Sequence, residues 1–198
     1  LKRVAALRGV RFDPRRVGRV DHVLAPPYDV VSRQHVQAFL ARSPYNVLQL
    51  DLGIADLSDP VPGQWSEVGH RFREWLASGV LRPDERPSVY VFRHTYRLPD
   101  ATPGTLTAVL VGLRVGPGAS RAAMGHERTV AAVRGDRLEQ LRRCRAQFSP
   151  ILALVSDPDR RVQQALDEAA LAEPSLRAQA PTGGDLAVWV YPAESPQG

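Results

Sequence analysis

Four consecutive residues in the second half of the chain carry side chains suited to proton transfer and phosphate binding. The run His126-Glu127-Arg128-Thr129 joins an imidazole, a carboxylate, a guanidinium and a hydroxyl. Arginine offers paired N–H donors that match phosphate oxygens, and the threonine hydroxyl can donate a hydrogen bond or bind a metal ion. Either Glu127 or His126 can accept a proton. The run predicts a catalytic phosphate site, and the alternative is an exposed charged loop.

A second short motif, Gly135-Asp136-Arg137-Leu138, follows closely. We expect Asp136 either to cap the next helix or to join the substrate site. Arg137 is expected to turn into the same phosphate site, and the alternative is a solvated arginine at the start of a helix.

A loop with two consecutive prolines leads into Tyr28-Asp29 and is the second candidate binding site. The prolines make this loop rigid, so Asp29 beside an aromatic ring is suited to bind a substrate amine, a ribose or a metal. The alternative is an aspartate that closes a turn onto its own backbone. Tyr45-Asn46 is expected to join this substrate site or to fill a turn.

Motifs of several other enzyme classes are absent from the sequence. It contains no phosphate-binding loop, no complete dinucleotide-binding glycine motif, no zinc-type pair of histidines and no nucleophile elbow. A single cysteine, Cys144, excludes an internal disulfide and a cysteine-based zinc site. We expect a packed, unreactive thiol, and the alternative is a thiol pKa lowered by the neighbouring Arg143 and Arg145. No metal site is predicted.

The positive charge of the chain is concentrated in two segments. The net charge is +5, and arginine supplies all the cations except one lysine. Residues 1–19 carry seven cations against one acid, and residues 121–145 carry seven against three. Such clusters favour an anionic ligand or a nucleic-acid backbone, although a GC-rich genome also enriches arginine. No apolar run is long enough to cross a membrane, and no secretion signal opens the chain. We therefore expect a cytoplasmic protein without a membrane partner.

Hydrophobic periodicity predicts alternating helices and strands. Helices are expected at 33–41, 64–78, 134–145 and 157–171, strands at 47–52, 88–98, 105–115, 150–155 and 186–191, and loops at 53–63 and 119–132. In the third helix, Leu138 and Leu141 are expected to face inward. The two strands at 88–98 and 105–115 form a hairpin, so the predicted fold is α/β of the α+β kind. It has a mixed sheet, an antiparallel hairpin and flanking helices. We expect one domain over residues 1–198, with a frayed tail at 193–198.

Several of these motifs together resemble the start of a bacterial family called domain of unknown function 1015. The matching segments follow the order of the family and cover nearly the whole chain: Leu7–Pro14, Ala25–Val30, Asn46 with Val47–Leu52, Tyr90–Arg93, His126–Thr129, Asp136–Leu138 and Ser149–Ile151.

The resemblance implies that this chain corresponds to the N-terminal half of a longer protein. Its members carry an Asp-Gly-His-His-Arg-Tyr type motif in a second half, which is similar to a box of the ParB and sulfiredoxin superfamily that includes free-serine kinases. The resemblance thus implies ParB-like elements, a nucleotide or phosphoryl site and, as cofactor, ATP or ADP with Mg²⁺. Members have a lysine between the two motifs where this chain has Arg134 as the only cation. Arg134 is therefore assigned to the phosphate site with Arg128, Thr129 and Arg137.

Three functions remain open from the sequence. The first is phosphoryl transfer or nucleotide hydrolysis on a nucleotide or phosphorylated small molecule. The second is a non-catalytic half or subunit that needs a C-terminal half or partner carrying the missing motif. The third is nucleic-acid binding through the arginine segments, which ranks last because no reader motif is present.

Overall fold

The structure is a computed structural model that describes residues 4–27, 30–52, 63–115 and 130–193. The chain divides into two compact units. We call residues 1–10, 83–124 and 152–198 the sheet unit, and residues 11–82 and 125–151 the helical unit. The division falls within two short strands that pair with each other, β2 (Val10–Phe12) and β3 (Leu81–Pro83).

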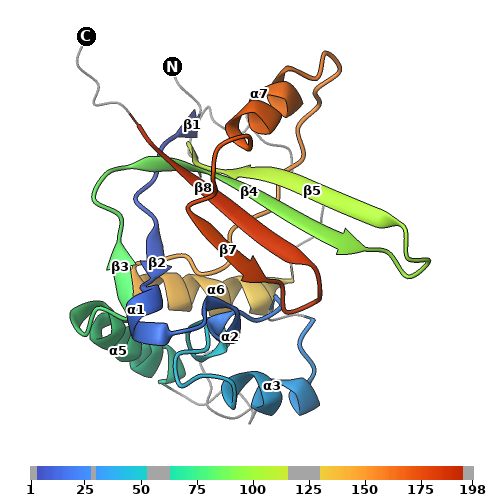
Figure 1. Ribbon diagram of the computed structural model, residues 1–198. Coiled ribbons are helices and arrows are strands. Elements are labelled where there is room, and N and C mark those ends of the chain that lie inside the picture. Colours follow the sequence, from blue (N-terminus) through green and yellow to red (C-terminus); the bar gives the residue numbers. More distant parts are fainter. Residues whose placement is uncertain (1–3, 28–29, 53–62, 116–129, 194–198) are drawn as a thin grey trace. The chain divides into compact units, whose positions relative to one another are not determined.

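The sheet unit contains a four-stranded sheet whose pairings are antiparallel (Figure 1). The strand order is β5 (Pro103–Leu110), β4 (Ser88–Arg97), β8 (Asp185–Pro192) and β7 (Leu176–Gln179). A second antiparallel pair joins β1 (Val4–Ala5) and β6 (Gly112–Leu113). The predicted hairpin and the predicted last strand are confirmed, and so is the α+β class.

One helix, α7 (Arg161–Ala169), packs on this sheet. The segment that follows the helix is held by the indole of Trp189 in β8, which donates to the carbonyl of Ala172 at 2.7 Å. The helix itself is held by Asp167, which accepts a hydrogen bond from Arg93 at 2.9 Å. The helix begins at Arg161, four residues later than predicted, because the Asp157 carboxylate accepts hydrogen bonds from backbone N–H groups of the first turn and so ends the preceding loop.

The helical unit contains six helices in its described residues. They are α1 (Pro14–Val17), α2 (Val20–Val23), α3 (Arg33–Leu40), α4 (Leu48–Asp51), α5 (Gln64–Ala77) and α6 (Ala131–Cys144). Helices α3 and α5 confirm two predictions. In α5, Trp65, Val68, Phe72 and Trp75 recur at helical spacing and are buried, and Gly79 follows with φ of 74°, a conformation that suits glycine after a helix end.

Aromatic side chains form much of the core of the helical unit. Trp75 lies 6.0 Å from Phe12 and 5.7 Å from Tyr45, measured between ring centroids, and Phe72 lies 5.2 Å from Phe148. These aromatic pairs connect α5 with chain segments before and after it.

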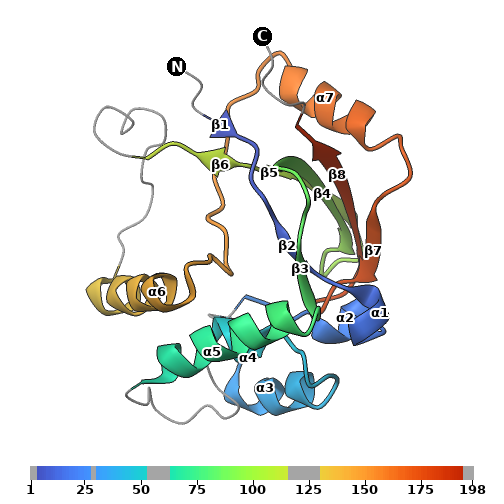
Figure 2. The ribbon, with the colours of Figure 1, turned by 90° about the vertical axis from the view of Figure 1, so that its left-hand side faces the viewer.

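Helix α6 lies beside α5 (Figure 2). A Cβ atom at Gly69 of α5 would lie 3.0 Å from the Arg143 carbonyl oxygen, so glycine permits this close approach. The predicted inward orientation of Leu138 and Leu141 is wrong, since both are exposed. The buried positions of α6 are Gln140 and Cys144 instead, because polar contacts described below fix the rotation of the helix.

The predicted strand at 47–52 is wrong, because this segment forms the short helix α4. The preceding turn explains the difference. The Asn46 side-chain oxygen accepts a hydrogen bond from the Leu48 N–H at 3.1 Å, and the Asn46 carbonyl accepts one from Gln49. Asparagine therefore starts a helical turn here, and the alternation of apolar residues reflects one turn with Leu48 and Leu50 buried.

The predicted strand at 150–155 is also wrong. Residues 150–156 form no helix or strand, and Ile151 and Leu154 are 85% and 89% exposed. The segment has the apolar composition of a buried strand, but no strand in the described part of the chain pairs with it. Composition alone does not supply the hydrogen-bond partners that a strand needs.

Among the helices that the structure describes, none is long and apolar enough to cross a membrane. The predicted tail is described only at residue 193. The predicted loops at 53–63 and 119–132 lie mostly outside the described residues, although Ala131 already belongs to α6.

Gly9 lies so close to Tyr90 that a larger residue does not fit. The Gly9 N–H donates to the Tyr90 hydroxyl at 2.7 Å, and a Cβ atom at Gly9 would lie 2.5 Å from the same oxygen. Tyr90 is buried and donates to the Asp84 carboxylate. We predict that Gly9→Ala lowers the free energy of unfolding by about 1 to 3 kcal/mol, because it overpacks this contact.

Gly135→Ala is the matched control for this prediction. No atom lies within 4 Å of a Cβ at Gly135, which is inside α6. The added methyl group should stabilise the protein by about 0.5 to 1 kcal/mol through helix propensity. Urea unfolding of both variants measures the difference, and equal effects of the two substitutions would contradict the proposed contact.

Candidate functional site

Arg137 of α6 lies at the centre of a polar cluster in the helical unit. Its Nη1 donates to the Asp51 carbonyl at 2.9 Å and to the Asp51 carboxylate at 3.2 Å. Its Nε and Nη2 donate to the Asp136 carboxylate at 3.2 and 2.8 Å, and Nη1 is 3.2 Å from the Gln140 side-chain oxygen. The guanidinium carbon is 4.9 Å from the centre of the Trp65 ring, a cation–π contact. One side chain thus joins α4, α5 and α6.

Asp51 is the buried acid of this cluster. It ends α4, and besides Arg137 its carboxylate accepts a hydrogen bond from the Ser149 hydroxyl at 2.8 Å. The Gln140 amide donates to the Leu50 carbonyl at 2.9 Å. We call Asp51, Trp65, Asp136, Arg137, Gln140 and Ser149 the Arg137 cluster. It brings together three segments of the helical unit, which are Asp51 at the end of α4, Trp65 in α5, and residues 136–149.

Asp136 was expected either to cap the next helix or to join the substrate site. The first of these roles is wrong, because Asp136 does not cap the helix. Helix α6 starts at Ala131, and its N-cap is Val130 in an extended conformation, so Asp136 lies inside the helix. The Asp136 carboxylate accepts hydrogen bonds from Arg137 and from the Trp65 indole, the latter at 2.8 Å. A carboxylate with charged and indole donors is oriented by them.

Asn46 is completely buried and is bonded to the backbone on both sides of its amide. Its Nδ2 donates to the carbonyls of His22 and Leu24 at 3.0 and 3.1 Å, and its oxygen accepts from Leu48. The two donors and the acceptor of the amide are therefore used to dock α4 against the end of α2. These contacts explain an asparagine at this position without a ligand.

Six of the sequence-predicted site residues lie outside the described residues. They are Tyr28, Asp29, His126, Glu127, Arg128 and Thr129. The described residues resume at Val130, directly after Thr129. Arg134 follows one helical turn later. The Arg134 side chain is exposed, and no residue in the described ranges forms an ion pair or hydrogen bond with its guanidinium.

Cys144 is a packed thiol, as expected from the sequence. Burial at the end of α6 raises the pKa of this thiol, and the positive charge of Arg73 opposes the shift only in part. The protonated thiol is therefore favoured at neutral pH, and the alternative of a lowered pKa is wrong.

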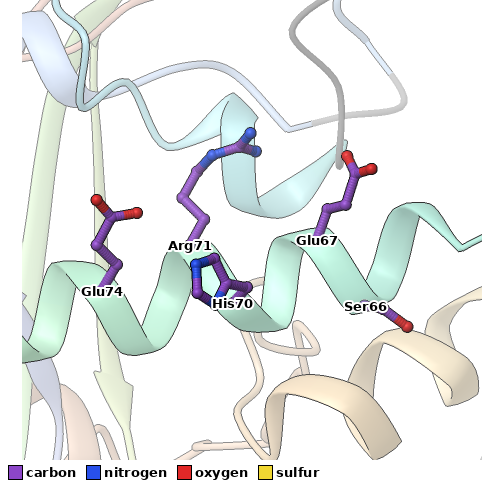
Figure 3. A pocket seen from close by; sticks show the side chains of 5 residues that line it. All are labelled: Ser66, Glu67, His70, Arg71 and Glu74. Atoms are coloured by element: carbon purple, nitrogen blue, oxygen red, sulfur yellow. The ribbon is translucent and has the colours of Figure 1, made fainter.

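A shallow pocket lies along one exposed side of α5 (Figure 3). It is lined by Ser66, Glu67, His70, Arg71 and Glu74, which all belong to one helix and include no residue predicted from the sequence. Arg71 already donates to the Gln49 carbonyl at 3.1 Å. Within the described ranges, no group of three histidine, cysteine or acidic side chains is arranged to hold a metal ion.

Sequence reasoning missed Asp51 and Gln140 as members of the cluster. Asp51 ends an apolar segment that starts at Asn46, and an acid at that position is a signal that it needs a partner. The partner, Arg137, is 86 residues away in the sequence, so spacing alone does not identify it.

The fold and this cluster define an α+β protein with an antiparallel sheet unit and a helical unit in which a buried aspartate pairs with a half-buried arginine. Residues 4–195 match the sequence model of a family described as "Protein of unknown function (DUF1015)". The match spans nearly the whole chain, so the chain belongs to this family, as the resemblance of its motifs predicted. No curated protein and no solved structure gives a significant match.

The contacts of Asn46 give a prediction for Asn46→Asp. A carboxylate cannot donate to the carbonyls of His22 and Leu24, so we expect the free energy of unfolding to fall by about 2 to 4 kcal/mol at neutral pH. These carbonyls raise the pKa of the new carboxyl in the folded state. The loss should therefore be greatest above that pKa and should shrink as the pH falls and the carboxyl becomes protonated.

Urea unfolding at neutral pH and at about pH 4 tests this expectation. Gln49→Ala is the control on the same helix, since it removes only an exposed side-chain bond to the Pro44 carbonyl and should cost about 0.5 kcal/mol. If the loss in the free energy of unfolding caused by Asn46→Asp did not change with pH, the role assigned to the Asn46 amide would be contradicted.

The Arg137 cluster predicts that Asp51→Ala is strongly destabilising. It removes a carboxylate that compensates the partly buried guanidinium and leaves the Ser149 hydroxyl without this acceptor. We expect a loss of about 2 to 3 kcal/mol in the free energy of unfolding, because one partner of a buried pair is deleted.

Arg143→Ala in α6, the helix that carries Arg137, serves as the comparison. Arg143 forms an exposed ion pair with Glu139 at 2.7 Å, and such pairs contribute about 0 to 1 kcal/mol. Thermal or urea unfolding measures both variants. A loss at Asp51 no greater than that at Arg143 would show that the cluster does not stabilise the helical unit.

Proposed function

We propose that this chain binds a phosphate-bearing ligand at the start of α6 and takes part in phosphoryl transfer. The run His126-Glu127-Arg128-Thr129 directly precedes this helix in the sequence. The first N–H groups of a helix have no partner within it and carry a partial positive charge, which favours phosphate. The observation that carries the proposal is the exposed Arg134 in the first turn of the same helix.

The proposal gives Arg134 and Arg137 of α6 different tasks. Arg137 has its donors directed at Asp51, Asp136 and Gln140, so a phosphate contact there has to compete with two carboxylates. Its proposed task is to hold α6 in a fixed orientation. The guanidinium of Arg134 is exposed to solvent and is the proposed phosphate contact, together with Arg128 and Thr129.

The finer parts of the proposal come from the family resemblance and from side-chain chemistry. They are a ParB-like phosphoryl site, a kinase-type reaction on a small hydroxy-amino acid such as serine, and ATP or ADP with Mg²⁺ as cofactor. Glu127 or His126 is the proposed base that removes the hydroxyl proton. Tyr28, Asp29 and Asp136 are the proposed substrate contacts.

Calorimetric titration of the chain with ATP and with ADP, with and without Mg²⁺, tests the proposal. We expect saturable binding by the wild type and a loss of about tenfold or more in affinity for Arg128→Ala and for Arg134→Ala, because each removes a charge-assisted contact. Glu127→Gln should retain binding and lose any turnover, since it removes only the base.

Arg142→Ala is the matched control for Arg134→Ala. Both arginines are exposed and lie on α6, but Arg142 is in the last turn, about 12 Å along the helix from Arg134. Its substitution should leave the affinity unchanged. The absence of binding by the wild type, or equal effects of the two substitutions, would overturn the assignment of the phosphate site.

A second candidate function is that of a subunit whose site is completed by a partner. The exposure of the apolar segment at 151–155 favours it, because Ile151, Leu152, Leu154 and Val155 are all mainly exposed. In that case, nucleotide binding would require a partner protein that covers the segment, and the isolated chain would show none in the titration above.

A further inference from the structure

Helix α7 is attached to the sheet with little burial. None of its nine residues is buried, and its apolar Val162 is 39% exposed. The strand that it contacts, β5, carries Val109, which is 40% exposed. The register places Val109 on the same face of the sheet as Arg93 and Trp189, and Arg93 pairs with this helix. The sheet unit therefore buries no residue of α7.

The polar attachments of α7 to the sheet lie toward its C-terminal end. Asp167, in the last turn, pairs with Arg93 of β4 at 2.9 Å. The Tyr191 hydroxyl donates to the Ala169 carbonyl, and the residues that follow the helix are held by the Trp189 indole. These bonds fix one end of the helix to β8 and leave the other end to be held by other contacts.

The segment before α7 does not fasten the helix to the sheet. Residues 151–156 are exposed and form no helix or strand. The Asp157 carboxylate accepts hydrogen bonds from the N–H groups of Val162 and Gln163, and these bonds join the helix only to its own cap. Within the described part of the chain, the side chains of Arg161–Leu166 form no hydrogen bond with a strand. The first turns of α7 therefore have only half-exposed apolar contacts with the sheet.

Arg93 is oriented by the sheet as well as by α7. Its Nε donates to the Thr107 hydroxyl of β5 at 3.3 Å, and its guanidinium carbon lies 5.8 Å from the centre of the Trp189 ring. Its Nη2 donates to Asp167 of α7. If α7 left the sheet, the first two contacts would remain and only the carboxylate would be withdrawn. The sheet would then present an oriented cation.

We infer that α7 is a releasable cover on this face of the sheet, and that Asp167 closes it by binding the guanidinium of Arg93. The partners of this ion pair are 27% and 52% exposed, so water and salt weaken their attraction. The four strands pair without any residue of α7, so they stay paired when the helix is released. In the open state, Arg93 can donate charge-assisted hydrogen bonds to an external anion.

Hydrogen exchange of the 198-residue chain, followed by mass spectrometry, tests the inference. A helix of nine residues is marginal in water, so α7 loses its internal hydrogen bonds on release, and the amides of residues 164–169 report the event. The strand β4 and the helix α5, which has five buried residues, are internal references. We expect the amides of α7 to exchange about 100-fold or more faster than those of both references.

The salt dependence of exchange tests the role of the ion pair in the wild type. Raising the sodium chloride concentration to about 1 M should increase the exchange rate of α7, relative to that of α5, about twofold to fivefold, because it screens the attraction between Arg93 and Asp167. This measurement requires no variant, so it stands even if a substitution prevents folding.

Asp167→Lys places two positive charges together and should raise the exchange rate of α7 about fivefold to tenfold. Glu168→Lys is the matched control, because it makes the same charge change at the next position. The Glu168 carboxylate has no ion pair among the residues that the structure describes, so this variant should exchange like the wild type. Circular dichroism checks that both variants are folded.

The inference would be overturned if α7 exchanged only as slowly as β4, since the helix would then open only when the sheet unit unfolds. Equal effects of the two lysine substitutions, or an α7 rate independent of salt, would also overturn it, because the ion pair would not hold the cover closed. The inference concerns the sheet unit alone and does not rest on the proposed phosphate site, so either can fail alone.

Discussion

The pairing of Arg137 with Asp51 determines how the helical unit is assembled. Removing two charges from water is costly, and the cost is offset only when further hydrogen bonds complete the pair. Here Asp136, Gln140 and Trp65 supply these contacts. Because hydrogen bonds are directional, the cluster fixes the rotation of α6 about its axis. An apolar stripe does not set that rotation, since the two leucines on the middle turns of α6 are exposed.

The helix α5 shows what the sequence predicts well, and α4 and α6 show where it fails. In α5 four large apolar residues share one side, so burial and periodicity agree. In α6 the buried positions include Gln140, whose amide bonds to the Leu50 carbonyl 90 residues earlier. In α4 the side chain of Asn46 converts an alternating apolar pattern into a helical turn. Both errors arise because a buried polar side chain overrides a pattern of apolar residues.

For the candidate site, too, the sequence predicted one part and not the other. Residue types pointed to Asp136 and Arg137 and the family resemblance added Arg134, and all three belong to α6. Their partners were not predictable, because Asp51 meets Arg137 only after the chain has folded. The network therefore separates an arginine that orients a helix from one that remains exposed to solvent. From the sequence, both Arg134 and Arg137 were expected to bind phosphate.

The contacts of the arginines also bear on the size of the ligand. The two basic segments carry acids that pair with them: Arg15 with Asp13, Arg19 with Asp21, and Arg143 with Glu139. Nucleic-acid affinity rises with the number of phosphates that a protein neutralises, and cations already paired contribute less to that count. A single helix start with one or two exposed arginines matches one phosphate group better than a polymer of phosphates. Under the proposed function, these internal pairs are the reason for choosing a small phosphorylated ligand at α6 over a nucleic acid.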